Sequence, residues 1–159
     1  MSSDPNTKLG QAYELYEIGR PLPAERIAKE ALDIFIEQKD KLGESEANFF
    51  LGVFYKYKSG WKNVPEQEYI DKAIEKLKLA ETGYKSIGEN IQASKVTFEL
   101  GQSYRSKNRI DLTCKYYEES LELYKTGQGQ YKEFRFNPEY NSPIDLINAH
   151  VEHVCAKKT

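Results

Sequence analysis

The stretch from Ala47 to Tyr57 reads ANFFLGVFYKY, and its centre, LGVFY, begins at Leu51. The same Leu-Gly-x-x-Tyr pattern begins again at Leu9 and at Leu100. Three copies of one pattern in a chain of 159 residues indicate a repeated helical unit rather than an irregular globule.

Each copy is followed by a second set of residues spaced four and then three apart. Residues at these spacings share one face of a helix, and small side chains there let a neighbouring helix approach closely. The pattern therefore predicts a second helix in every unit. The three sets are Ala24, Ala28 and Ala31; Ala73, Leu77 and Ala80; and Thr113, Tyr117 and Ser120.

The repeat has a constant length once the connectors are taken into account. The Leu-Gly pairs begin 42 and 49 residues apart, and the first two units hold 2 and 9 more connector residues than the third. Without these insertions both spacings are 40 residues. We expect three stacked helix pairs over residues 4–38, 40–88 and 90–127. Gly10, Gly52 and Gly101 would then serve close helix contacts, because each costs a helix about 1 kcal/mol relative to alanine.

The pattern stops after Gly127. Residues 128–141 form an irregular connector, in which Tyr131 to Phe136 partly alternates and could be a short strand or hairpin. A final helix over residues 142–157 is indicated by Ser142 as N-cap and Pro143 at its first position. It would cap the exposed end of the stack. The fold class is therefore all-α, a superhelical stack of three helix pairs plus a capping helix in a single domain, 1–159.

Composition limits the function classes. The chain has 23 basic and 25 acidic side chains, a net charge of −2, which argues against a nucleic-acid-binding protein. The opening MSSDPNTKLG lacks the basic and apolar segments of a secretory signal, and no apolar run is long enough to span a membrane. Cys114 and Cys155 lie far apart in the sequence, so we expect free thiols and a cytoplasmic location.

The two helix patterns together resemble the tetratricopeptide repeat (TPR) family, over about Lys8 to Gly127. The 40-residue spacing, with Ile87-Gly88-Glu89, looks like the long variety found in kinesin light chains and in bacterial peptide-sensing regulators. The chain departs from the family at several positions. The usual tryptophan is replaced by Asn6, Asn48 and Thr97, the usual late proline by Ile36, Lys85 and Lys125, and the usual small apolar residues of the third unit by Thr113 and Ser120.

The resemblance implies that the first helix of each unit lines a concave groove that binds a partner. The centre of this groove would be aromatic with a basic fringe, which suits a partner polypeptide with apolar anchors and acidic flanks. Alternatively, Phe49 and Phe98 belong to the core or lie under the terminal helix. The partner-binding residues predicted in this way are Phe49, Val53, Lys56, Tyr57, Lys95, Phe98, Gln102 and Arg105; the first unit supplies Asp4, Thr7, Gln11, Glu14 and Leu15.

Other sites are less well supported. The clamp with which some members of the family grip chaperone carboxylates needs Lys and Asn at set positions, and only Lys95 fits it. His150, His153 and Cys155 do not form a zinc set on one helix, so we expect no metal and no cofactor. No nucleophile or phosphate-binding motif occurs. The chain is therefore expected not to be an enzyme.

A chain that is nearly all repeat acts by holding another molecule. The expected function is a protein–protein interaction module, adaptor or chaperone-like, that binds a partner polypeptide in the groove. One alternative is a toxin-neutralising, immunity-type inhibitor of a secreted bacterial effector, and another is a self-assembling homo-oligomeric scaffold, with a homodimer possible. The insertion at 61–66, with Trp61, carries specificity or seals a loop base. The 128–141 connector either seals the end of the array or carries specificity.

Overall fold

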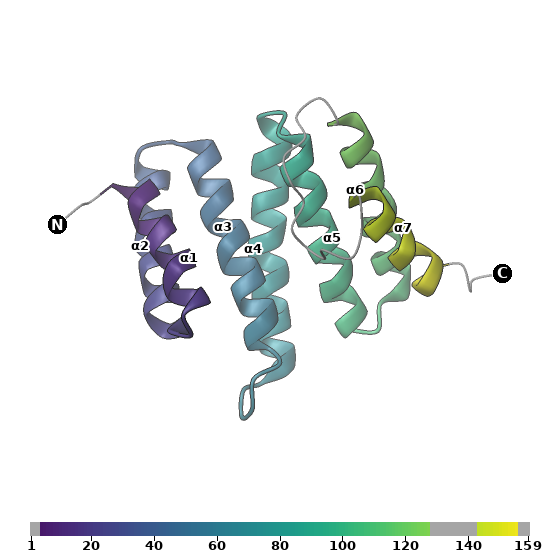
Figure 1. The fold of residues 1–159 in the computed structure, drawn as a ribbon, viewed down its shortest axis with the longest axis horizontal. Helices are drawn as coiled ribbons and strands as arrows, with labels where there is room; N and C mark the ends of the chain where they lie inside the picture. Colours follow the sequence, from purple (N-terminus) through teal and green to yellow (C-terminus); the bar gives the residue numbers. More distant parts are fainter. Residues whose placement is uncertain (1–3, 128–142, 156–159) are drawn as a thin grey trace. The chain divides into compact units, whose positions relative to one another are not determined.

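The computed structural model describes residues 4–127 and 143–155, and these form seven helices without a strand (Figure 1). The all-α prediction is confirmed for this part of the chain. The predicted strand or hairpin at Tyr131 to Phe136 and the predicted N-cap Ser142 lie outside the described residues. The helices are α1 Pro5–Glu17, α2 Pro21–Glu37, α3 Lys41–Lys58, α4 Glu66–Ser86, α5 Asn90–Ser106, α6 Ile110–Thr126 and α7 Pro143–Val154.

The chain divides into two compact units, Met1–Ile87 and Gly88–Thr159. In the first unit α1 packs on α2, α3 on both α2 and α4, and in the second unit α5 and α7 both pack against α6. The division falls where the second predicted repeat ends and the third begins. The core of the first unit consists mainly of the small and aromatic side chains of α1 to α3.

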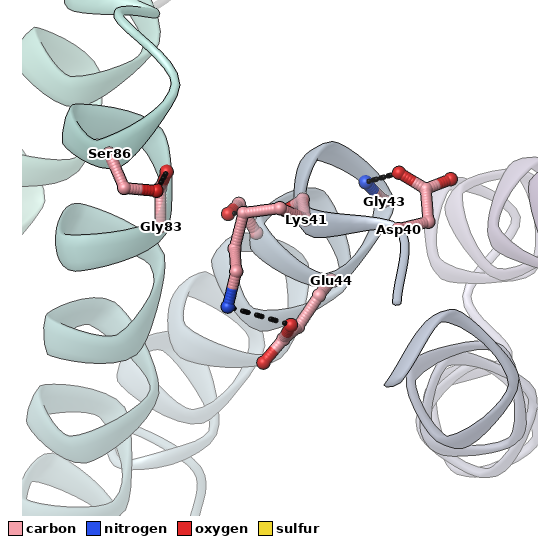
Figure 2. Close-up of polar contacts among 7 residues, drawn as sticks. Asp40, Lys41, Gly43, Glu44, Gly83 and Ser86 are labelled. Carbon is pink, nitrogen blue, oxygen red and sulfur yellow. Dashed lines mark hydrogen bonds and ion pairs between the residues drawn. The ribbon is translucent and has the colours of Figure 1, made fainter. Parts of the chain in front are cut away.

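Local signals in the sequence set the starts of α1, α2 and α3. Asp4 accepts a hydrogen bond from the amide of Asn6 and acts as the N-cap of α1. Asp40 accepts one of 3.0 Å from the amide of Gly43 and acts as the N-cap of α3 (Figure 2). Gly19, which follows α1, has a φ of 82°. Helix α2 begins at Pro21, because a proline in the first turn loses no intrahelical hydrogen bond.

Two of the three pattern glycines lie at close helix contacts, as predicted. A Cβ on Gly52 would meet the side chain of Leu77 at 2.7 Å, and one on Gly101 would meet the ring of Tyr117 at 2.5 Å. Gly10 does not, because nothing lies within 4 Å of the position its Cβ would take. In the repeat register the place of Leu77 and Tyr117 is held by Ala28, whose side chain is shorter.

The expectation of free thiols is also wrong. Cys114 on α6 and Cys155, directly after α7, form a disulfide bond, with their Cα atoms 5.7 Å apart. The two residues are 41 positions apart in the sequence, and α7 brings them together because it packs back onto α6. This removes the thiol argument for a reducing compartment, and the cytoplasmic location stays a prediction. No helix among the described residues is long and apolar enough to cross a membrane.

Candidate partner-binding surface

The four predicted binding residues on α3 lie at or near the surface of the first unit. Tyr57 is 51% exposed, and the ammonium group of Lys56 lies 5.0 Å from the centre of its ring. Val53 and Phe49 are half-buried, and the Phe49 ring has its edge against Tyr84. These side chains are therefore accessible to different degrees, with Tyr57 the most accessible.

The four predicted residues on α5 belong to the second unit and are arranged differently. Phe98 is only 2% exposed, because its ring stacks on Tyr117 at 5.3 Å and α7 covers the pair. Burial raises the pKa of the Tyr117 hydroxyl to about 12, although the positive charge of Arg105 opposes this shift. Arg105 is exposed, and Lys95 and Gln102 are half-buried. Phe98 can contact a partner only if α7 moves away.

Two tyrosines of α1 that were not among the predicted binding residues extend the surface beside Tyr57. Tyr13 has its ring edge on Phe50 at 4.7 Å, and Tyr16 contacts Phe50, Phe54 and Tyr57 at ring distances of 5.9–6.5 Å. Tyr13 is 46% exposed, Tyr16 is half-buried, and the two phenylalanines are buried beneath them. We call these five side chains, Tyr13, Tyr16, Phe50, Phe54 and Tyr57, the α1–α3 aromatic face.

The charges around this face differ from one end to the other. The negative charge of Glu46 acts on the Tyr13 hydroxyl, whereas the cation of Lys56 lies over the Tyr57 ring. Partial burial, and then the neighbouring Tyr57 hydroxyl, raise the pKa of Tyr16 above its ordinary value. Tyr16 is therefore uncharged at neutral pH and offers a ring and a hydroxyl that can hydrogen bond. An extended peptide could place an acidic side chain beside Lys56 and an apolar one between the tyrosines.

The sequence contained a partial signal for this face. Tyr13, Tyr55 and Tyr104 hold the same place in the repeat pattern, but they are 46%, 5% and 9% exposed. Tyr55 is buried by residues of α2 and α4. The pattern tyrosine marks a position at which helices can make contact, and the helices packed around each copy decide its exposure.

A polar cluster lies between α2, α3 and α4 of the same unit. The Glu25 carboxylate accepts a 2.9 Å hydrogen bond from the Tyr55 hydroxyl, and it forms ion pairs with Lys29 at 3.1 Å and Lys58 at 3.6 Å. The ammonium group of Lys58 also lies 4.7 Å from the centre of the Tyr69 ring. These contacts already pair the charges of the cluster, which indicates a structural role.

A hollow of about 290 Å³ beside this cluster has a mixed lining. It is formed by Lys29, Tyr55, Lys72, Glu75 and Lys76. Glu25 already pairs with Lys29, and Glu68 pairs with Lys72. The lining therefore offers little unpaired positive charge to an anion.

The two histidines considered for zinc lie on α7, and Trp61 lies between α3 and α4. His150 of α7 is half-buried with its ring edge on Phe98 at 4.9 Å, whereas His153 is exposed. No group of three or more His, Cys, Asp or Glu side chains that could hold a metal occurs within residues 4–127 and 143–155. Trp61, in the connector between α3 and α4, has its ring 6.0 Å from that of Phe54.

Comparison with known proteins identifies no family for this chain. No protein-family model matches the sequence, and no curated protein matches it either.

Proposed function

We propose that this chain is a non-enzymatic protein-binding module, built as a stack of TPR-like helix pairs, that holds a partner polypeptide on the α1–α3 aromatic face. The observation that carries the proposal is the exposure of two tyrosines: Tyr13, whose ring lies on buried Phe50, and Tyr57, whose ring lies beside half-buried Tyr16. Exposed tyrosines on a rigid base supply contact area while losing little side-chain entropy on binding. The matching partner is a peptide segment with an apolar or aromatic anchor.

The difference in charge between the two ends of the face indicates the direction in which such a peptide would lie. Lys56 at the Tyr57 end favours an acidic residue of the partner, and Glu46 at the Tyr13 end disfavours one. The sequence predicted a partner with acidic flanks beside its apolar anchors. The charges on the face now predict acidic residues on one side of the anchor only. An adaptor and a chaperone-like protein could both use such a site. The immunity-type and self-assembling alternatives stay alternatives, since no feature of the face favours them.

Selection from a random peptide library on the immobilised full chain tests the proposal. We expect enriched peptides to share an aromatic or leucine anchor with an acidic residue on one side. Tyr13→Ala and Tyr57→Ala should each weaken binding of such a peptide by about tenfold or more in fluorescence polarisation, because central aromatic residues dominate interface energetics. Lys56→Glu should weaken acidic peptides and spare their neutral versions.

Leu79→Ala is the matched control, because Leu79 is 49% exposed and lies on α4, outside the aromatic face. It should change the affinity by less than about twofold, in keeping with the small effect of residues outside an interface. Circular dichroism should show that each variant is folded. Equal losses for Leu79→Ala and Tyr57→Ala would contradict a specific face, and so would a failure to enrich any anchored peptide.

A further inference from the structure

Helix α7 covers an apolar surface of the second unit with one of its sides. Leu146 and Ile147 are buried against Phe98 and Tyr117, and Val151, Val154 and Cys155 pack at the edge of the same cluster. Asp145, Glu152 and His153, on other sides of the helix, are exposed. α7 is therefore an amphipathic helix seated on a site formed by α5 and α6.

The attachment of α7 has two parts, an apolar contact and a covalent bond. The apolar part is small, because only Leu146 and Ile147 are buried among the α7 side chains that the structure describes. A helix of 12 residues is marginal in water unless packing or a tether holds it. The Cys114–Cys155 disulfide supplies that tether at the C-terminal end of α7.

We propose that α7 is a lid latched by this disulfide, and that reduction of the bond releases α7 and opens on α5 and α6 a docking surface for an amphipathic helix of a partner protein. The lid itself does not depend on the α1–α3 aromatic face. Only the identification of the occupant as a partner protein rests on the proposed function. The kind of occupant follows from α7, which shows what chemistry the surface accepts: two adjacent aliphatic side chains facing Phe98 and Tyr117, and a polar opposite side.

The exposure of the two cysteines gives the order of the reaction. Cys114 is 2% exposed, whereas Cys155 is partly exposed, so a thiolate of a dithiol reductant attacks the Sγ of Cys155. The S–S bond breaks, and Cys114 leaves as a thiolate that takes up a proton. The second thiol of the reductant then attacks the mixed disulfide, and Cys155 leaves as a thiolate that is protonated in turn. The protein gains two electrons and two protons, and the reductant becomes a cyclic disulfide.

Hydrogen exchange followed by mass spectrometry tests the lid on the full chain. In the oxidised protein we expect slow exchange in Pro143–Val154. After treatment with a dithiol, exchange of α7 should become at least about tenfold faster, because a local opening no longer has to break a covalent tether. Peptides of α1 to α4 should exchange at unchanged rates. Thiol titration with Ellman's reagent should give no free thiol before reduction and two after it.

The variant Cys155→Ser separates release of the lid from loss of folding. Cys155 is only partly buried at the end of α7, so its replacement leaves α5 and α6 intact, and without reductant the variant should exchange like the reduced wild type. A labelled peptide of residues 143–155 carrying Ser in place of Cys155 should bind to the reduced chain and to Cys155→Ser, but not to the oxidised chain.

Two results would overturn the proposal: equal protection of α7 in the oxidised and reduced chains, or equal binding of the labelled peptide to both. Either result would leave the tests of Tyr13 and Tyr57 unaffected. Conversely, failure of the aromatic face to bind peptides would leave the exchange experiment unchanged. The proposal of the lid and the proposed function can therefore be contradicted independently of each other.

Discussion

At the residue scale, the same glycine of the repeat pattern has different roles in different copies. Gly52 is required by packing, because any side chain there would meet Leu77, whereas Gly10 has open space around it. We expect Gly10→Ala to raise the free energy of unfolding by about 0.5–1 kcal/mol, since alanine is the better helix former and restricts the unfolded chain. Gly52→Ala should lower it by about 1–3 kcal/mol through overpacking. Urea denaturation of both variants measures the difference.

Each substitution serves as the experimental control for the other, since both replace a helical glycine by alanine in the first unit. Stabilisation by both would mean that the Leu77 side chain can move aside at little cost in free energy, and that stability does not require the close approach of α3 and α4. A loss at Gly10 would instead mean that the exposed surface of α1 is needed for packing. The Leu-Gly-x-x-Tyr pattern alone could not distinguish the two positions, because the space around each glycine depends on residues of other helices.

The pattern alone also could not predict which aromatic residues are buried. Phe98 was predicted to bind a partner, but the terminal helix covers it, as the alternative interpretation allowed. Tyr13 was not among the predicted binding residues, but it is exposed. In both cases the exposure of the ring depends on whether a helix distant in the sequence packs over it, and spacing along one helix carries no information about that.

At the element scale, Glu25 ties α2 to α3. Its carboxylate binds the Tyr55 hydroxyl and pairs with Lys58, which is mostly buried. We expect Glu25→Gln to lower the free energy of unfolding by about 1–3 kcal/mol, because the buried cation of Lys58 loses its counter-charge. Glu68→Gln, which breaks an exposed pair with Lys72, should cost less than about 1 kcal/mol. Denaturant titration at neutral pH compares the two.

The same contact has a definite pH dependence. Burial alone would raise the pKa of Glu25, but the hydrogen bonds from Tyr55 and Lys29 and the charges of Lys29 and Lys58 lower it below 4.5. Since the pKa in the folded chain lies below that in the unfolded chain, the stability from Glu25 is present above pH 4.5 and disappears as pH falls below it. The difference between wild type and Glu25→Gln should therefore shrink on acidification. A difference that stays constant would contradict this assignment of the charge.

Most helices could be predicted from local sequence signals, because caps, glycines and apolar spacing act within a few residues. The predicted units 40–88 and 90–127 begin at the N-cap of α3 and at the first residue of α5. The disulfide could not be predicted, because it depends on how α7 folds back across 41 residues. The Glu25 cluster was missed for a similar reason, since its members come from three helices.

At the scale of the whole molecule, the repeat pattern and the structure lead to different expectations. A linear array of three helix pairs is stabilised by contacts between neighbouring repeats, so a piece of it should be unstable alone. The structure instead divides into two compact units, and Met1–Ile87 has its own core of buried residues from α1 to α4. In this unit α3 packs against both α2 and α4, so the two helix pairs share an interface that lies wholly within the fragment.

If that core suffices, the isolated fragment of residues 1–87 should fold on its own. We expect a helical circular dichroism spectrum and a single cooperative urea transition, because small domains with one continuous core unfold in an all-or-none manner. Glu25→Gln and Gly52→Ala should destabilise the fragment by the same amounts as the full chain, since their partners all lie within it. A fragment that is unfolded, or that loses helix gradually with urea, would show that the second unit is required and that the chain behaves as one array.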